Sequence, residues 1–153
     1  MPFPLKGASR TIQLILACAS LAFSGSAFGR GQPLTPEQVL ANAAQYTVKI
    51  NVQTTTGLNA DEIGEHSGTG FLIDRERGWF LTNAHVASRS PGKIALTFKG
   101  GKPIPAQRVH VDTFMDLAVL EIPTQQIPPS ATVARLDCDQ LPQEGASVFA
   151  YGH

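Results

Sequence analysis

The sequence predicts a mainly β protein in which six antiparallel strands form a small barrel behind a short N-terminal helix. Three observations support this prediction. Six segments of strand character lie between Tyr46 and Ile122, at the close spacing of a small barrel. The 14 glycines and 11 prolines are scattered widely, as in a protein with many short strands and turns. Hydrophobic residues make up 42% of the 153 residues, which is enough for one packed core.

Residues 1–29 have the layout of a secretory signal peptide. A weakly basic start is followed by a short apolar stretch and then by small residues. Ala27 and Gly29 fit the two small positions before a cleavage site, so we predict cleavage before Arg30. The apolar stretch is too short to span a bilayer comfortably. A lipoprotein signal ending at Cys18 fits poorly, because the apolar stretch continues past it. The mature protein is expected to be periplasmic or extracellular, without stable membrane insertion.

The segment 30–45 contains the predicted helix. Thr35 is a good N-cap, Pro36 suits the first helical position, and Gln38 completes a capping box. The helix is expected to end near Gln45, where the hydrophobic period changes from helical to alternating.

The segment 46–122 contains the predicted barrel. Its first strand is marked by alternate apolar residues, namely Tyr46, Val48, Ile50 and Val52. A polar loop follows over 54–66, and the remaining strands are expected at Gly68–Asp74, Trp79–Ala84, Lys93–Lys99, Ile104–Val111 and Leu117–Ile122. Pro103 and Pro105 favour an edge position for the fifth strand. The sixth strand is apolar enough to be buried on both faces.

The segment 123–153 begins with a long connection rich in Pro and Gln and ends in an apolar strand over Ala146–Tyr151. A linker of this length is unusual within a compact domain. An apolar strand without a partner would leave its backbone groups unpaired. We therefore expect this strand to open a second domain that the chain does not include.

Charge and residue spacing exclude several classes of function. Twelve basic residues balance twelve acidic ones, and without a long basic run the chain is not expected to bind nucleic acid. No pair of His, Cys, Asp or Glu has a familiar zinc spacing, so neither a metal nor a cofactor is expected. If the signal peptide is removed, Cys138 is the one remaining cysteine and is expected to be a loop residue.

Two residues at strand ends are candidates for catalysis. His85 ends the apolar segment that begins at Trp79, where a rigid scaffold can present a side chain to a cleft. Asp116 precedes the apolar run that starts at Leu117, and a carboxylate there needs a hydrogen-bond donor. A histidine ring N–H would supply one, which is the pairing of base and orienting carboxylate in nucleophilic triads.

Three motifs together closely resemble the trypsin-like serine peptidases of the Deg/HtrA type. They are SGTGFLI, LTNAHV and DLAVLEI, at Ser67–Ile73, Leu81–Val86 and Asp116–Ile122. The resemblance implies a Greek-key barrel that forms the first half of a double barrel, with His85 and Asp116 as catalytic residues. It also implies that Gly145–Gly152 opens the second barrel. Peptidases of this type often form trimers, so the resemblance allows an oligomer.

These observations predict an exported serine endopeptidase that acts on protein or peptide substrates. In the family, the nucleophilic serine lies in a G-N-S-G-G-type motif that this sequence lacks, so the chain alone is expected to be an inactive fragment. Ser67 precedes a first-barrel strand, a position that the family uses structurally. One alternative is a non-catalytic barrel or binding module derived from a peptidase. Another is a thiol peptidase, which would require Cys138 near His85, whereas the resemblance places Cys138 on the inter-barrel linker.

Overall fold

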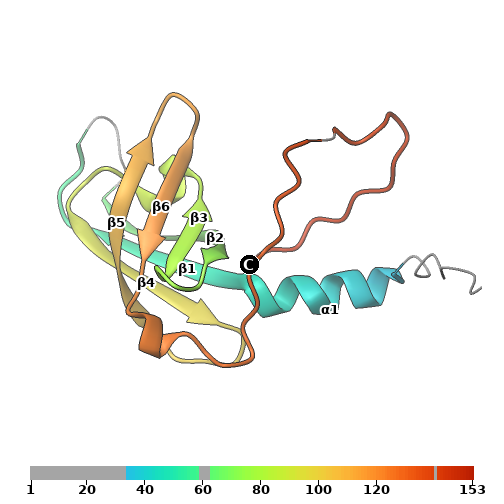
Figure 1. The fold of residues 1–153 in the computed structure, drawn as a ribbon. Coiled ribbons are helices and arrows are strands. Elements are labelled where there is room, and N and C mark those ends of the chain that lie inside the picture. Colours follow the sequence, from blue (N-terminus) through green and yellow to red (C-terminus); the bar gives the residue numbers. More distant parts are fainter. Residues whose placement is uncertain (1–33, 59–62, 140) are drawn as a thin grey trace, which may run out of the picture. The chain divides into compact units, whose positions relative to one another are not determined.

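The computed structural model describes residues 34–58, 63–139 and 141–153. The predicted signal peptide, residues 1–29, lies outside the described residues. Within the described residues, the first element is α1 (Pro36–Tyr46), which leads directly into β1 (Thr47–Thr54) (Figure 1). The predicted capping box is confirmed, since Gln38 N donates to Thr35 Oγ1 at 3.3 Å and Thr35 N donates to Gln38 Oε1 at 2.9 Å. No helix in the described part of the chain is long and apolar enough to cross a bilayer.

Six antiparallel strands form a closed barrel, as predicted. After β1 come β2 (Gly64–Asp74), β3 (Trp79–Thr82), β4 (Gly92–Phe98), β5 (Ile104–Asp112) and β6 (Leu117–Glu121). The order around the barrel is β1-β2-β3-β6-β5-β4, and β1 pairs with both β2 and β4 (Figure 1). The adjacent strands β4-β1-β2-β3 form a Greek key, because the fourth strand returns to lie beside the first.

The core lies inside the barrel and follows the strand alternation. Val48, Ile50 and Val52 of β1 are almost completely buried, and polar residues between them face outward. Phe80 of β3 meets Phe98 of β4 edge to face, with ring centroids 5.8 Å apart. The alternating pattern that predicted the strands is therefore the pattern that fills the core.

Several predicted strand details are wrong. β3 ends at Thr82 instead of Ala84, because the chain turns into a one-turn helix, α2 (Ala84–Ala87). β6 is buried on one face only, with Leu117 exposed, because the outer face of the barrel meets solvent. β5 is not an edge strand: it pairs with β4 and β6, although its pairing with β4 covers only Ile104–Ala106. Pro105 lies within that short pairing and has no N–H to donate.

Hydrogen bonds hold the connection after β6 against the barrel. It begins with a short 3-10 helix, η1 (Thr124–Gln126). The guanidinium of Arg75, in the β2–β3 turn, donates to the carbonyl oxygens of Ala131 at 2.7 Å and Pro128 at 2.8 Å. Further along, Ala134 N donates to Leu72 O at 2.8 Å. The linker is therefore held at its start by backbone hydrogen bonds and one arginine.

The strand predicted over residues 146–151 is absent from this structure. These residues have no regular secondary structure, and Val148 and Phe149 are exposed. A β-strand gains its stability from a hydrogen-bonded neighbour, and the six barrel strands are already paired on both sides. The assignment of this segment to a second barrel stays a prediction.

Candidate functional site

The first residue of the site is carried by α2. Asn83 has an extended backbone and caps this helix, and Ser88, with φ of 56°, ends it after one turn. The helix packs closely on β2 at Gly68, where an added Cβ would lie 2.5 Å from a methyl carbon of Val86. A glycine in β2 is therefore required for α2, and with it His85, to approach the barrel this closely.

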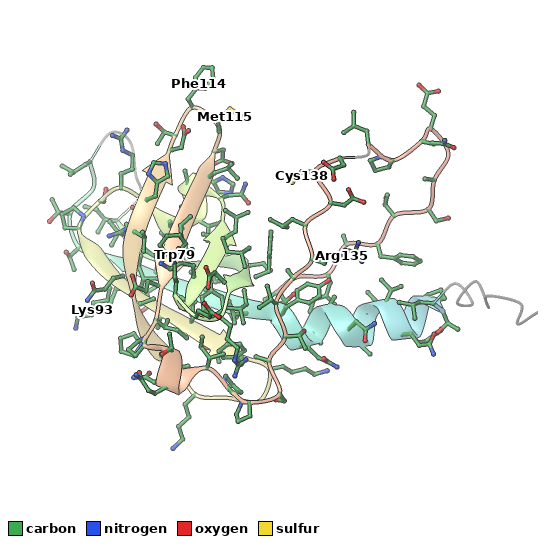
Figure 2. The ribbon with its side chains drawn as sticks, in the orientation of Figure 1. Trp79, Lys93, Phe114, Met115, Arg135 and Cys138 are labelled. Carbon is green, nitrogen blue, oxygen red and sulfur yellow. The ribbon has the colours of Figure 1, made fainter. Side chains whose placement is uncertain are left out.

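The second residue of the site lies in the turn between β5 and β6. Asp116 has a φ of 52°, the left-handed conformation that Asp tolerates better than most residues. The turn is stabilised by Asp112, whose Oδ1 accepts from Phe114 N at 2.9 Å and Met115 N at 3.0 Å. Figure 2 shows Phe114 and Met115 at the tip of this hairpin. The turn positions Asp116 at the start of β6, facing α2.

The structure brings His85 and Asp116 together, which confirms the predicted proximity. The ring Nδ1 of His85 lies 2.8 Å from Oδ2 and 3.0 Å from Oδ1 of Asp116. The backbone N–H of His85 also donates to Oδ1, at 3.0 Å. Asn83 Nδ2 completes the arrangement by donating to Oδ2 at 3.1 Å and to the carbonyl of Asp116 at 3.2 Å. The carboxylate is thus held by three neighbouring donors.

These donors favour the ionised form of Asp116. The backbone N–H of His85 is the main cause that lowers the pKa of Asp116 below its ordinary value, with smaller contributions from the His85 ring and Asn83. An ionised carboxylate at Nδ1 favours the tautomer that carries its proton on Nδ1. That tautomer leaves Nε2 of His85 as the basic nitrogen. The side chains are 71% and 46% exposed, so the pair is open to an incoming group.

The serines near the site have other contacts. Gly68 and His66 of β2 both contact Val86 of α2, so Ser67, between them, points to the opposite face of the strand. Ser88 and Ser90 are buried, with Ser90 N donating to Ser88 Oγ at 3.0 Å. Leu58 N donates to Ser90 Oγ at 2.8 Å.

The other three histidines and Cys138 form no hydrogen bond with the His85–Asp116 pair in the described part of the chain. His66, expected in a loop, belongs to β2, where its Nε2 lies 3.1 Å from Val86 O. His110 lies on β5 and is exposed, and His153 N donates to Thr69 Oγ1 at 2.9 Å. Cys138 is exposed on the segment after β6 (Figure 2).

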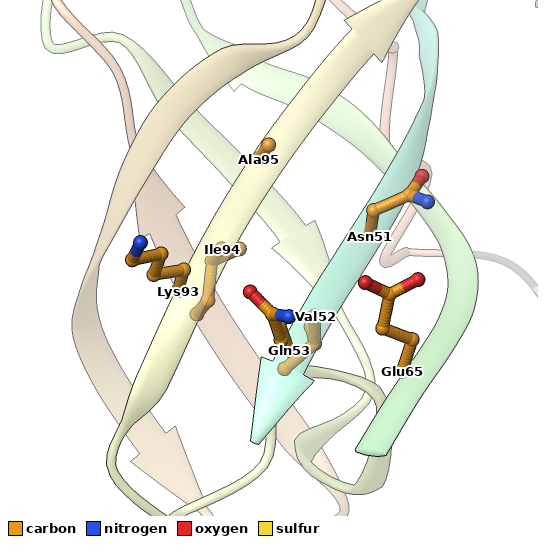
Figure 3. A pocket seen from close by; sticks show the side chains of 7 residues that line it. All are labelled: Asn51, Val52, Gln53, Glu65, Lys93, Ile94 and Ala95. Carbon is orange, nitrogen blue, oxygen red and sulfur yellow. The ribbon is translucent and has the colours of Figure 1, made fainter. Parts of the chain in front are cut away.

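A separate depression lies on the outer face of β1, β2 and β4 (Figure 3). Its volume is about 190 Å³, and its polar side chains include Gln53, Glu65 and Lys93 from three adjacent strands. It contains neither His85 nor Asp116, and no nucleophile lies beside a base in it. Among the described residues, no three His, Cys, Asp or Glu side chains are grouped as metal ligands would be. The His85–Asp116 pair is therefore the stronger candidate for chemistry.

Sequence reasoning missed the residues that support the pair. Asn83 lies inside the LTNAHV motif, but the sequence does not show that its amide would reach Asp116. Arg108 and His66 bind carbonyl groups in and after α2 from two other strands. These contacts depend on barrel closure, and no local pattern marks them.

Comparison with known families decides the classification. The sequence profile of the trypsin-like peptidase domain matches residues 68–153, more than half of the chain. The chain belongs to the trypsin-like peptidase family. This match includes both His85 and Asp116.

Proteins similar to this chain include serine proteases of the Deg/HtrA type, as the motifs predicted. One is a probable periplasmic serine endoprotease, DegP-like, from Chlamydia pneumoniae, 41% identical over 61 residues, or 40% of this chain and 12% of that protein. Another is the mitochondrial serine protease HTRA2 of Drosophila willistoni, 30% identical over 118 residues, or 74% of this chain and 26% of that protein. The chain thus matches no more than 26% of the length of either relative.

A solved structure supports the same assignment. The serine endoprotease from Yersinia pestis superposes with a TM-score of 0.54 at 26% sequence identity. The alignment covers 74% of this trypsin-like peptidase chain and 37% of the Yersinia chain. The predicted fold class, a six-stranded barrel of trypsin-like type, is therefore confirmed.

Proposed function

We propose that this chain supplies the base and the orienting carboxylate of an exported serine endopeptidase. His85 is the general base, and Asp116 orients its ring and stabilises the imidazolium that forms. The observation that carries the proposal is the 2.8 Å contact between Nδ1 of His85 and Oδ2 of Asp116. It occurs in a chain of the trypsin-like peptidase family whose similar proteins are named as serine proteases.

The proposed reaction is hydrolysis of a peptide bond in a protein or peptide substrate. Nε2 of His85 removes the proton from a serine hydroxyl, which attacks the substrate carbonyl carbon. The same nitrogen returns the proton to the leaving amine, and a water molecule then releases the acyl group by the same route. Asp116 keeps its charge throughout, and the donors that lower its pKa favour this.

We propose that the attacking serine comes from a second barrel, outside the residues described here. Ser67 points away from α2, and the hydroxyl oxygens of Ser88 and Ser90 accept backbone N–H groups within the barrel. The second barrel would also supply the oxyanion donors, each worth roughly 10²–10³ in rate. On this proposal, the chain alone has no peptidase activity.

The test begins with the reading frame beyond the codon for His153. The proposal expects this frame to encode a G-x-S-G-G motif and the longer protein to hydrolyse casein. In the longer protein, Asp116→Asn should lower kcat by about 10⁴-fold and His85→Ala by about 10⁶-fold. His110→Ala is the matched control, an exposed histidine of the same barrel that should leave kcat/KM unchanged.

Three outcomes contradict the proposal. A stop codon directly after His153 would instead favour a non-catalytic barrel or binding module derived from a peptidase. Full activity in His85→Ala of the longer protein would refute the triad assignment. Casein hydrolysis by the present chain that disappears in His85→Ala would show that its nucleophile lies within these 153 residues, with Ser67 the first to test.

A further inference from the structure

The one-turn helix that carries His85 depends on side chains from other strands for its hydrogen bonds. A helix end leaves backbone carbonyl groups without partners inside the helix. In α2, Ser88 N donates to Ala84 O at 2.9 Å. The carbonyls of Val86 and Ala87 instead accept from side chains, those of His66 on β2 and Arg108 on β5. The helix is thus fixed from two sides of the barrel.

Arg108 makes the more extensive of these contacts. Its Nε donates to Ala87 O at 2.9 Å, and its Nη2 donates to Ser90 O at 2.9 Å. The two acceptors lie at the end of α2 and in the segment that follows it, and both residues are completely buried. One planar guanidinium therefore fixes the path of the chain immediately after His85.

The β5 strand has the geometry that directs Arg108 toward α2. Ile104, Ala106 and Arg108 alternate on the inner, partly buried side of the strand. A register shift follows, because Arg108 pairs with Leu120 while His110 pairs with the next residue along, Val119. Such a bulge locally redirects a strand and its side chains. The charged end of Arg108 thereby reaches the carbonyls at the end of α2.

We propose that Arg108 is a positioning residue for His85. It does not touch the pair; it holds the turn after His85 so that Nδ1 stays on the Asp116 carboxylate. This inference rests on the proposed roles of His85 and Asp116. Without Arg108, the buried carbonyls of Ala87 and Ser90 would lose this charged donor, which weakens the hold on the turn after His85. The imidazole would move with the turn.

The test determines which ring nitrogen of His85 carries the proton in the present chain. This measurement does not require the chain to be catalytically active. Long-range ¹H–¹⁵N spectra, recorded above the titration range of histidine, distinguish a ring nitrogen that carries a proton from one that does not. The wild-type ring should carry its proton mainly on Nδ1. In Arg108→Met this preference should be lost, and the protection of the His85 backbone N–H from exchange should fall, since it also donates to Asp116.

Two variants separate positioning from stability and from charge. Arg75→Met is the matched control, because Arg75 also donates to backbone carbonyls of a loop. Its acceptors lie on the linker instead of α2 and belong to Ile127, Pro128 and Ala131. It should leave the His85 tautomer unchanged. Arg108→Lys keeps the positive charge but offers a single donor nitrogen. This variant should therefore retain only part of the wild-type preference for a proton on Nδ1 of His85. If Arg108→Met does not fold, the comparison of Arg108→Lys with Arg75→Met decides the question.

The outcomes distinguish this inference from the proposed function. Asp116→Ala should abolish the Nδ1 preference, and a wild-type tautomer in that variant would contradict the pairing on which the proposed function depends. If Asp116→Ala abolishes the preference while Arg108→Met and Arg108→Lys both keep it, Arg108 has no positioning role and this inference is wrong. An equal loss of the Nδ1 preference in Arg75→Met and Arg108→Met would also overturn this inference, because the loss would then reflect general destabilisation of the barrel.

Discussion

At the residue scale, the site depends on a single aspartate held in an uncommon conformation. Asp116 adopts a left-handed backbone, with φ of 52°, and accepts from the ring and backbone of His85 and from Asn83. A positive φ in a non-glycine residue costs about 1–2 kcal/mol. The bonds that the carboxylate accepts favour this conformation, and they are strongest when it is ionised. The conformation of the turn and the charge of Asp116 are therefore linked.

This linkage predicts a response of the site to acid. The pKa of Asp116 is lowered in the folded protein, so its stabilising effect is present above the ordinary value of about 3.9 and is lost as pH falls through the lowered value. Hydrogen exchange should show the protection factor of the His85 amide falling below about pH 4. The Ser88 amide, which donates to a carbonyl of the same helix, is the internal control.

Asp116→Asn should remove this dependence, because a carboxamide does not titrate in this range. A protection factor for His85 that stays constant in the wild type down to about pH 2 would contradict the linkage. A parallel fall at Ser88 would show that the whole helix unfolds and that Asp116 is not the cause.

At the element scale, the position of α2 is set by how closely it can approach β2. Gly68 is opposite Val86, and any Cβ at residue 68 would lie 2.5 Å and 2.6 Å from the two methyl carbons of that valine. Close packing of α2 on β2 depends on both residues, because the absence of a side chain at Gly68 leaves the space that the Val86 side chain occupies. Gly68 therefore matters to the site even though it has no side chain to contribute to it.

Gly68→Ala is predicted to push α2 outward and lower the free energy of unfolding by about 1–3 kcal/mol. Val86→Ala should relieve this, because it removes both methyl carbons and leaves the nearest contact at 3.2 Å, to the Cβ of Val86. Urea unfolding of the two single variants and the double variant should give a favourable coupling of about 0.5–3 kcal/mol. Ser67→Ala, on the opposite face, is the control and should change stability by less than about 0.5 kcal/mol. Strict additivity of the two changes would contradict this packing argument.

At the scale of the whole molecule, the barrel is closed but the site upon it is open. The six strands pair without a free edge, and the linker is fixed to the barrel by Arg75. In contrast, His85 is 71% exposed, and apolar residues of the segment after β6, including Leu141 and Val148, are also exposed. An exposed base and exposed apolar side chains beyond β6 are what the proposed second barrel would cover.

Export of the whole protein is predicted from its N-terminus. Expressed with its own N-terminus in a bacterium, the protein should appear outside the cytoplasm with a new N-terminus near Arg30, because residues 1–29 read as a cleavable signal. N-terminal sequencing of the exported protein checks this. Exported protein that still begins at Met1 would refute cleavage, and labelling of Cys18 by a lipid precursor would indicate the lipoprotein route instead.

The sequence by itself predicted the helix, the number of barrel strands, and the proximity of His85 and Asp116. These features depend on local signals: the capping box at Thr35, the two-residue alternation from Val48 to Val52, and short motifs around His85 and Asp116. Such signals act within a few residues along the chain, so a single sequence reveals them.

Only the tertiary structure decided where β3 ends, that residues 146–151 form no strand, and how the site is supported. Each depends on contacts between residues far apart in the sequence. Asn83 reaches Asp116 across 33 positions, and Arg108 reaches Ala87 across 21. A strand is stable only beside a hydrogen-bonded partner strand, and a buried carbonyl is stable only beside a donor. Closure of the barrel decides which segments obtain such a partner strand or donor.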